Sequence, residues 1–250
     1  MRKMLLSACV ALTVLGCGGD DGDLPPCLDS RCMRVYSICG DRAYDASTEF
    51  CYEGTVYSVK SDISNYRTVV IGTQTWMAEN LDYNVEGSKC YDNDLANCNT
   101  YGRLYDWATA MALPPSCNSN SCANMIQSPH RGICPSGWHI PSNDDWDVLM
   151  TTVGGYDTAG TKLKAGSGWR NYYQGTSGNG TDEYGFSALP GGYGNPDGYF
   201  GYVNNDGNWW SASEDDSDSA SDRHMYSSYD YVSISSSYKS YLYSVRCLQD

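Results

Sequence analysis

Twelve cysteines are spread along the 250 residues of the chain. Whether they pair depends on where the chain folds, because disulfides persist in oxidising compartments and are rare in the cytosol. Arg2 and Lys3 precede a mostly apolar run from Met4 to Leu15. This is the pattern of a cleaved secretory signal, and the run is too short to span a bilayer as a mature helix. We therefore expect an exported chain with a disulfide framework.

The signal ends at Val14-Leu15-Gly16-Cys17, which resembles the lipobox of bacterial lipoproteins. The resemblance implies that residues 1–16 are removed and that Cys17 is acylated, with residues 17–26 as a flexible acidic tether. An ordinary secretory signal with an incidental cysteine is the alternative. The expected location is the cell envelope, on the outer membrane and facing outward. The membrane would be a partner because the acyl chains, such as palmitate, insert into it.

Ten cysteines remain after Cys9 in the signal and Cys17 at the anchor. Zinc is disfavoured because no C-x-x-C pair occurs and only three histidines are present. Sequence leaves the connectivity of ten cysteines open, but spacing suggests the local pairs Cys27/Cys32, Cys39/Cys51, Cys90/Cys98 and Cys117/Cys122. Cys134 and Cys247 are then left, and their link would close a loop of about 113 residues, worth about 4–5 kcal/mol in the chain-entropy model.

The charge of the mature chain limits its partners. Removal of residues 1–16 leaves 14 basic and 30 acidic groups, a formal charge of −16. This balance argues against nucleic acid, because phosphate binding needs clustered Lys and Arg. It also argues against electrostatic docking on anionic lipid. The aromatic residues are 22 Tyr and 7 Trp against only 3 Phe, and rings with a polar tip suit surfaces that are half wet.

The chain divides into a small Cys-rich region, residues 27–65, and one domain, residues 66–250. The alternation in residues 55–59 predicts a strand in the first region. In the domain, residues 144–153 have the strongest helix pattern, with an approximate capping box formed by Ser142 and Asp145. Further expected elements are strands at 68–72 and 74–77, a helix at 104–111, a closing strand at 241–247, and otherwise short strands and long loops from 160 onward.

Six ordered motifs resemble the Fibrobacter succinogenes major paralogous domain, from about residue 66 to 250. The resemblance implies an exported lipoprotein of a family that occurs in large paralogous sets. The matching segments are Ile71-Gly72-Thr73-Gln74-Thr75-Trp76-Met77-Ala78-Glu79-Asn80-Leu81, Tyr101-Gly102-Arg103-Leu104-Tyr105-Asp106-Trp107, Cys134-Pro135-Ser136-Gly137-Trp138-His139-Ile140-Pro141-Ser142, Gly185-Phe186-Ser187-Ala188-Leu189-Pro190, Trp210-Ser211-Ala212-Ser213-Glu214 and Ser244-Val245-Arg246-Cys247.

A weaker resemblance concerns the fold. Residues 138–146 and the ending Val245-Arg246-Cys247 are similar to stretches of the formylglycine-generating enzyme superfamily. The resemblance implies an α+β, C-type-lectin-like compact domain with few helices, short strands, long Gly/Tyr-rich loops and several disulfides. In such domains a disulfide commonly joins the region before the first helix to the last strand, where the Cys134–Cys247 pair would lie. Fold-level resemblance says little about function.

The sequence offers no convincing catalytic set. Formylglycine-generating enzymes use a pair of reactive cysteines near the C-terminus, and here only Cys247 lies in the last hundred residues. His130, His139 and His224 are scattered, and no G-x-S-x-G turn marks a nucleophile. An enzyme of the formylglycine-generating type is therefore the least favoured of three functions, and we expect no catalytic residues and no required cofactor.

Calcium is a second binding hypothesis. Calcium-dependent lectins of the C-type fold use an x-Pro-Asn/Asp loop and a later Trp-Asn-Asp strand, and residues 195–197 and 204–210 contain similar ingredients. The oxygen ligands would be Asp197, Asn205 and Asp206, because hard oxygen donors suit calcium. A Gly/Asn turn region without metal is the alternative. The acidic run 214–218 is likewise either a cation site or a solvated loop.

The Tyr/Trp-rich stretch between residues 193 and 231 predicts a ligand surface. Aromatic faces stack on the apolar face of sugar rings, while Asn, Asp and Tyr hydroxyls take the ring hydroxyls. We therefore expect a non-catalytic carbohydrate-binding or adhesion module for polysaccharide or another surface polymer. A structural or protein-interaction lipoprotein without a small ligand is the alternative, and burial of the rings would favour it. The candidate ligand-binding residues are Tyr193, Tyr199, Tyr202, Trp209 and Tyr229.

Overall fold

The computed structural model divides the chain into two compact units, Met1–Ser61 and Asp62–Asp250, and each is described by itself. Of the first unit it describes the backbone of four short segments, and of the second unit everything from Tyr66 onward. The described residues are 36–39, 42–45, 49–52, 55–58 and 66–250. The signal, Cys17, the tether, and the side chains of Cys27, Cys32, Cys39 and Cys51 lie outside the described residues.

The first unit contains two antiparallel hairpins. Strand β1 (Tyr36–Cys39) pairs with β2 (Arg42–Asp45), and β3 (Glu49–Tyr52) pairs with β4 (Thr55–Ser58). Strand β4 confirms the strand that the alternating pattern predicted at residues 55–59.

The second unit opens with a hairpin that belongs to a four-stranded sheet of order β5-β6-β15-β8. Its first two strands are the predicted ones, and Gly72 turns the chain between them with a positive φ of 61°. All pairs in this sheet are antiparallel. The strands are β5 (Thr68–Ile71), β6 (Gln74–Met77), β8 (Trp138–His139) and β15 (Leu248–Gln249).

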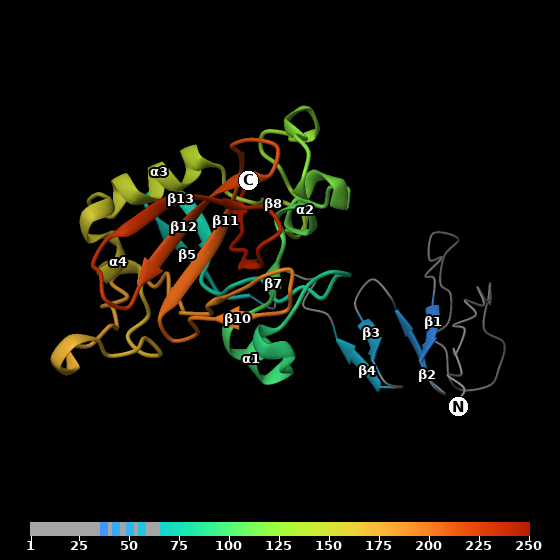
Figure 1. The fold of residues 1–250 in the computed structure, drawn as a ribbon, viewed down its shortest axis with the longest axis horizontal. Helices are drawn as coiled ribbons and strands as arrows, with labels where there is room; N and C mark the ends of the chain where they lie inside the picture. The colour runs from blue at the N-terminus through green and yellow to red at the C-terminus, as the bar shows by residue number, and fades with distance from the viewer. Residues whose placement is uncertain (1–35, 40–41, 46–48, 53–54, 59–65) are drawn as a thin grey trace. The chain divides into compact units, whose positions relative to one another are not determined.

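A five-stranded sheet of order β13-β12-β11-β14-β7 holds the long strands of the domain (Figure 1). Strands β11, β12 and β13 form an antiparallel meander, and β14 joins β11 in parallel. A small hairpin of β9 (Tyr193–Gly194) and β10 (Phe200–Gly201) precedes them. The strands of the sheet are β7 (Leu104–Tyr105), β11 (Asp206–Glu214), β12 (Ser219–Tyr226), β13 (Val232–Tyr238) and β14 (Tyr243–Ser244).

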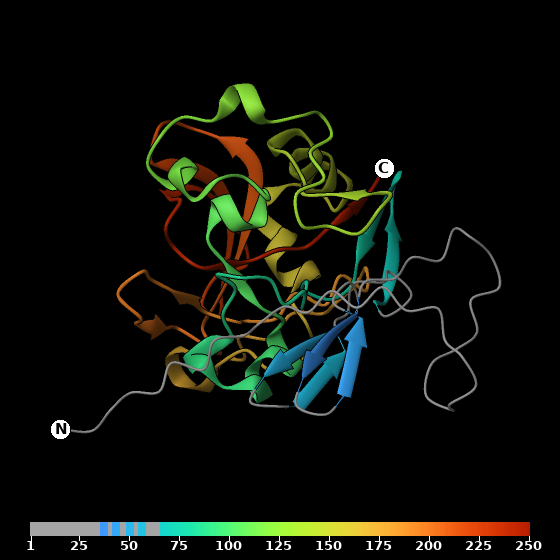
Figure 2. The same ribbon diagram turned by 90° about the vertical axis from the view of Figure 1, so that its right-hand side faces the viewer.

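The helices are short, and among the described residues none has both the length and the apolar composition to cross a bilayer. Helices α3 and α4 lie along one side of the meander in Figure 1, and Figure 2 shows the same arrangement turned by 90°. The α-helices are α1 (Leu95–Tyr101), α2 (Trp107–Ala110), α3 (Asn143–Thr152) and α4 (Tyr156–Leu163), and the 3-10 helices are η2 (Tyr91–Asn93), η3 (Pro115–Asn118), η4 (Ala123–Met125) and η5 (Tyr173–Gly175).

Helix α3 confirms the strongest sequence prediction. The Ser142 side chain accepts from the backbone N–H of Asp145, and the Asp145 carboxylate accepts from the N–H of Ser142, which completes the capping box. The apolar stripe is fully buried and packs with β11, β12 and β13 side chains such as Trp209 and Met225. The members of the stripe are Trp146, Leu149, Met150 and Val153.

The helix predicted at residues 104–111 is wrong in its first half. Leu104 exchanges both backbone hydrogen bonds with Lys89 and begins strand β7 instead. Helix α2 starts only at Trp107, because the Asp106 carboxylate accepts from the backbone N–H of Thr109 and caps the helix there. A capping residue inside the apolar pattern therefore splits it into a strand and a helix.

Two further elements differ from the sequence predictions. Of the closing strand predicted at 241–247 only Tyr243–Ser244 forms a strand, β14, and β15 follows it at Leu248–Gln249 in the other sheet. Helix α4 was not predicted, because Gly160 interrupts its pattern. Gly160 allows the helix to approach the turn between β12 and β13, since a Cβ at this position would lie 2.6 Å from the carbonyl oxygen of Tyr231.

Among the cysteines whose side chains are described, three disulfides form and match predicted pairs: Cys90–Cys98, Cys117–Cys122 and Cys134–Cys247. The last joins the segment before β8 to the segment before β15, across a sequence separation of 113. The domain is therefore a mixed helix-and-sheet fold with short helices, mostly short strands and several disulfides.

A buried polar centre connects three of the six motifs. Asn80 Oδ1 accepts from Trp209 Nε1 at 2.8 Å and from Arg246 Nη2 at 2.7 Å and Nε at 3.2 Å. Arg246 also donates to the carbonyl oxygen of Phe186, and its guanidinium carbon lies 4.3 Å from the centre of the Phe186 ring. Burial lowers the pKa of the Arg246 guanidinium, so these acceptors offset the cost of removing the charge from water.

Candidate functional site

The meander has two different faces. Residues paired across antiparallel strands share a face, and one register row is Trp210↔Asp222↔Ser235 while the next is Asn208↔His224↔Ser233. The opposite face carries the buried Trp209 and Met225 and packs under α3 and α4. The face that bears Asp222 and His224 is therefore turned away from these two helices.

A first group of tyrosine rings lies around the β9–β10 hairpin. The Tyr193 ring stacks on Tyr202, with centroids 5.8 Å apart, and meets Tyr199 edge-on at 6.3 Å. Tyr199 and Tyr202 are 54% and 55% exposed. Tyr193 also contacts Tyr241 at 5.9 Å, which in turn meets the 58% exposed Tyr238.

A second group follows strand β12. Tyr226 meets Tyr229 edge-on at 5.7 Å, and Tyr229 stacks on Tyr231 at 4.8 Å. Tyr229 is 49% exposed and Tyr231 is 37% exposed.

The buried ring of Tyr243 joins the two groups, because it contacts Tyr193 at 6.4 Å and the imidazole of His224 at 5.6 Å. His224 in turn contacts Tyr226 at 5.8 Å. We call this connected set the tyrosine surface, and it consists of Tyr193, Tyr199, Tyr202, Tyr226, Tyr229, Tyr231, Tyr238 and Tyr241 over a floor of Tyr243 and His224.

Four of the five predicted ligand-binding residues lie in the tyrosine surface: Tyr193, Tyr199, Tyr202 and Tyr229. Trp209 was assigned wrongly. It is completely buried on the helix-covered face, and its indole N–H donates to Asn80. Trp210 points to the opposite face of the same strand and is equally buried, so both indoles belong to the core.

The structure adds two residues that the sequence reading missed, Asp222 and His224. His224 Nε2 lies in close contact with the Asp222 carboxylate, which is fully buried. The other ring nitrogen, Nδ1, lies 3.2 Å from the hydroxyl of Tyr226. The three residues alternate along β12, so a strand period of two would have placed them on one face. Burial and the nearby carboxylates of Asp206 and Asp222 raise the pKa of Tyr226.

The three calcium candidates are spread over two turns. Asp197 is exposed in the β9–β10 turn, where the Asn195 side chain accepts from the backbone N–H of Tyr199. Asn205 Nδ2 donates to Asp206, while Asn205 Oδ1 accepts from Ser227. Within the described part of the chain, no group of three or more His, Cys, Asp or Glu could hold a metal ion. Calcium binding at these residues stays a prediction.

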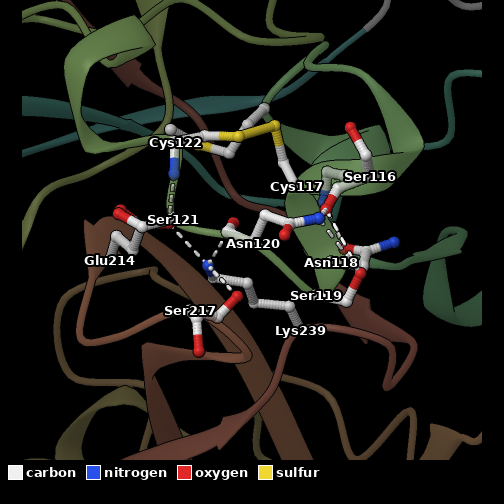
Figure 3. Close-up of a disulfide and its surroundings, with 12 residues drawn as sticks. Ser116, Cys117, Asn118, Ser119, Asn120, Ser121, Cys122, Glu214, Ser217 and Lys239 are labelled. Carbon is white, nitrogen blue, oxygen red and sulfur yellow. Dashed lines mark hydrogen bonds and ion pairs between the residues drawn. A yellow bond between two sulfur atoms is a disulfide. The ribbon is translucent and has the colours of Figure 1, made fainter.

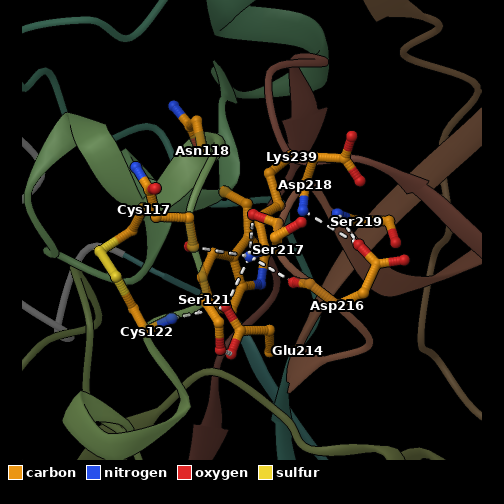
Figure 4. A network of polar contacts seen from close by, with 12 residues as sticks. Cys117, Asn118, Ser121, Cys122, Glu214, Asp216, Ser217, Asp218, Ser219 and Lys239 are labelled. Carbon is orange, nitrogen blue, oxygen red and sulfur yellow. Dashed lines mark hydrogen bonds and ion pairs between the residues drawn. A yellow bond between two sulfur atoms is a disulfide. The ribbon is translucent and has the colours of Figure 1, made fainter.

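The acidic run 214–218 is organised around a cation of the chain itself, the buried ammonium of Lys239. Its Nζ lies 2.5 Å from Glu214 Oε1 and donates to the carbonyl oxygens of Asp216 at 2.8 Å and Ser217 at 3.0 Å (Figure 4). Burial alone would raise the pKa of Glu214, but hydrogen bonds from Lys239, Cys122 and Ser121 lower it. The ammonium therefore fills the centre of this loop.

The same contacts tie the loop to the Cys117–Cys122 disulfide. Glu214 accepts from the Ser121 hydroxyl at 2.9 Å and from the backbone N–H of Cys122 at 2.8 Å. Figure 3 shows Lys239 reaching between Glu214, Ser217 and the Asn120 segment beside the disulfide. An ion pair and hydrogen bonds within the chain therefore organise this loop, and binding of an external cation by the acidic run stays a prediction.

The other two histidines have structural partners. His130 Nε2 lies 2.8 Å from the carbonyl oxygen of Met111. His139 lies between Asp250, at 2.8 Å from Nδ1, and Asp145, at 3.5 Å from Nε2. Burial alone would lower the pKa of His139, but the hydrogen bonds with the two carboxylates raise it. His139 thus links the capping box of α3 to the C-terminus.

Comparison with known proteins gives one match. A family model described as the Fibrobacter succinogenes major domain matches residues 69–249, which is most of the chain. No curated protein and no solved structure matches the chain. The match begins and ends within the second unit, which contains the tyrosine surface.

Proposed function

The chain belongs to the Fibrobacter succinogenes major domain family, and we propose that it is a lipid-anchored, outward-facing module that binds polysaccharide without catalysing a reaction. The observation that carries the binding proposal is the tyrosine surface. Five of its rings are more than a third exposed, namely Tyr199, Tyr202, Tyr229, Tyr231 and Tyr238. Exposed rings held by their neighbours form a rigid apolar surface with polar tips, which suits stacking on sugar rings.

The pattern of aromatic contacts supports an extended ligand. The two groups of the tyrosine surface are connected through Tyr243 and His224, so that several rings offer contacts along one connected set. A single monosaccharide covers about one ring, whereas a polymer engages several at once and gains affinity from each. Large exposed aromatic patches on a soluble domain are typical of interaction sites.

We expect alanine at Tyr199, Tyr202 or Tyr229 to weaken polysaccharide binding about 3–10-fold each, since an aromatic contact contributes roughly 0.5–1.5 kcal/mol. The measurement is affinity electrophoresis and pull-down on insoluble polysaccharides, with and without EDTA. The protein is the chain from Gly18 onward, secreted so that its disulfides form. The EDTA arm also tests calcium, because loss of binding with EDTA alone would support metal at Asp197, Asn205 and Asp206.

Tyr173→Ala is the matched control. Tyr173 is 78% exposed and lies in η5, and among the described residues it makes no ring contact with the tyrosine surface. Its replacement is expected to leave binding unchanged. Absence of binding to every polymer in both conditions would contradict the proposal and favour a structural or protein-interaction role.

The anchor is a separate part of the proposal and rests on Arg2-Lys3, the apolar run and the Val14-Leu15-Gly16-Cys17 ending. Metabolic labelling with a palmitate analogue in a bacterial host is expected to label the full chain and to fail for Cys17→Ser. Cys9→Ser, within the signal, is the control and should keep the label. Labelling of the Cys17→Ser chain at wild-type level would overturn the anchor.

The fold of the second unit is proposed to be C-type-lectin-like. In support, the Cys134–Cys247 disulfide joins the segment before α3 to the segment before the last strand, β15. Two shorter helices, α1 and α2, precede this point of the chain, so the resemblance would begin at α3. Superposition of an experimental structure on C-type-lectin-like domains would test this fold assignment. A strand order that differs from that of these domains would refute the assignment.

A further inference from the structure

The polar groups around Tyr226 in the tyrosine surface are arranged to accept hydrogen bonds. Asp222 is fully buried and a carboxylate accepts hydrogen bonds, so the tautomer of His224 that matches it carries the proton on Nε2, the nitrogen in close contact with this carboxylate. His224 Nδ1 is then an acceptor. The hydroxyl of Tyr226, 3.2 Å away, donates its proton to Nδ1.

Tyr226 consequently presents only lone pairs to a ligand. A phenol has one proton to donate, and here that proton is used in the hydrogen bond to His224. The neighbouring Asp206 is also an acceptor, because its carboxylate already receives the Asn205 amide and keeps further lone pairs. The part of the surface around Tyr226 therefore offers acceptors and is matched to ligand groups that donate, such as the hydroxyls of a sugar.

The charges around the tyrosine surface also disfavour an anionic ligand. Asp197 and Asp230 are exposed; Asp197 lies two residues before Tyr199, and Asp230 follows Tyr229 directly. The nearby ammonium of Lys164 is buried, and it donates to the carbonyl oxygens of Tyr226 and Tyr229. Arg170 is exposed, and its backbone N–H donates to the carbonyl oxygen of Asn204. This one exposed cation compares with the three carboxylates of Asp197, Asp206 and Asp230.

We infer that the ligand of this surface is a neutral glycan, rich in hydroxyl donors, and that polymers bearing carboxylates or sulfates are excluded. An anionic polymer would need donors where the surface has acceptors, and cations where it has carboxylates. This inference rests on the proposed binding of polysaccharide and names its chemical class.

The test compares neutral with acidic polymers, and the two cellulose derivatives among them share one backbone. Affinity electrophoresis of the chain from Gly18 onward is run through gels containing hydroxyethyl cellulose or carboxymethyl cellulose, and galactomannan or polygalacturonate, at low and high salt. We expect at least one neutral polymer to retard the protein, and this retardation to change little with salt. The acidic polymers should bind at least tenfold more weakly. Tyr226→Phe removes the oriented acceptor and should weaken neutral binding about 3–10-fold, the size of one hydrogen bond.

Asp230→Lys should increase retardation by the acidic polymers at low salt and lose this gain at high salt. Binding of acidic polymers as tight as that of neutral ones would overturn the inference while leaving polysaccharide binding intact. Unchanged neutral binding by Tyr226→Phe would remove the acceptor argument. Absence of binding to every polymer would overturn the inference together with the proposed function.

Discussion

Replacing Asn80 with leucine is expected to lower the free energy of unfolding by about 3–5 kcal/mol, a large fraction of the 5–15 kcal/mol typical of a domain. The Asn80 side chain is nearly completely buried. Its oxygen accepts from Trp209 and from two nitrogens of Arg246, and its nitrogen donates to Tyr101 O and Ser244 Oγ. Leucine would leave a buried guanidinium and a buried indole N–H without this acceptor.

Asn80→Asp separates the acceptor from the rest of the side chain. It keeps an oxygen for Trp209 and Arg246 and loses the amide donors, so it should lose markedly less stability than Asn80→Leu. Asn171→Leu, at an exposed position, should change stability by no more than about 0.5 kcal/mol. Urea unfolding followed by tryptophan fluorescence measures all three. A loss below about 1 kcal/mol for Asn80→Leu would show that the polar centre does not hold the motifs together.

The elements that could be predicted from sequence are those specified locally. Helix α3 carries its cap, its apolar stripe and its stop within about a dozen residues, and the β5–β6 hairpin carries its turn at Gly72. Neither needs a distant partner to be recognised. The local disulfides Cys90–Cys98 and Cys117–Cys122 were predictable for the same reason, since short spacing restricts the choice of partner.

The elements that could not be predicted depend on distant contacts. Leu104 is a strand residue because Lys89 and β14 lie beside it. Tyr243 and Leu248 fall into different sheets because β11 and β6 are the available partners. Such pairings decide between helix and strand where the local pattern allows both.

The candidate site shows the same division. The Tyr-rich composition predicted an aromatic surface, but only the register of β11 and β12 shows which side chains share a face. Trp209 lies on the face that packs with α3 and α4, and Asn208 and Trp210 lie on the other. Tyr238 and Tyr241 join the surface through the end of β13, beyond the range predicted. Asp222 and His224 are two residues apart, so they share a face if the segment is a strand. The sequence did not show that residues 219–226 form one.

Removing the Cys134–Cys247 disulfide with a double alanine substitution is expected to lower the free energy of unfolding by about 4–5 kcal/mol. The bond closes a loop with a sequence separation of 113, and in the chain-entropy model the restriction on the unfolded chain grows with loop length. It also fixes the segment in which the Cys247 carbonyl accepts from the N–H of Met77, next to the Leu248–Trp76 pair of β15 and β6. Loss of the bond therefore loosens the central pairing of the four-stranded sheet.

The matched control is the Cys117→Ala/Cys122→Ala chain, which loses a disulfide of sequence separation 5 and about 2 kcal/mol in the same model. Both pairs of sulfur atoms are buried, so the two double variants remove similar packing. Urea unfolding should give the larger loss for the long loop, together with a steeper dependence on urea because its unfolded chain is less compact. Equal losses with unchanged slopes would mean that the long disulfide contributes only local packing, and the C-terminal strand would then be held by its hydrogen bonds and by Arg246 alone.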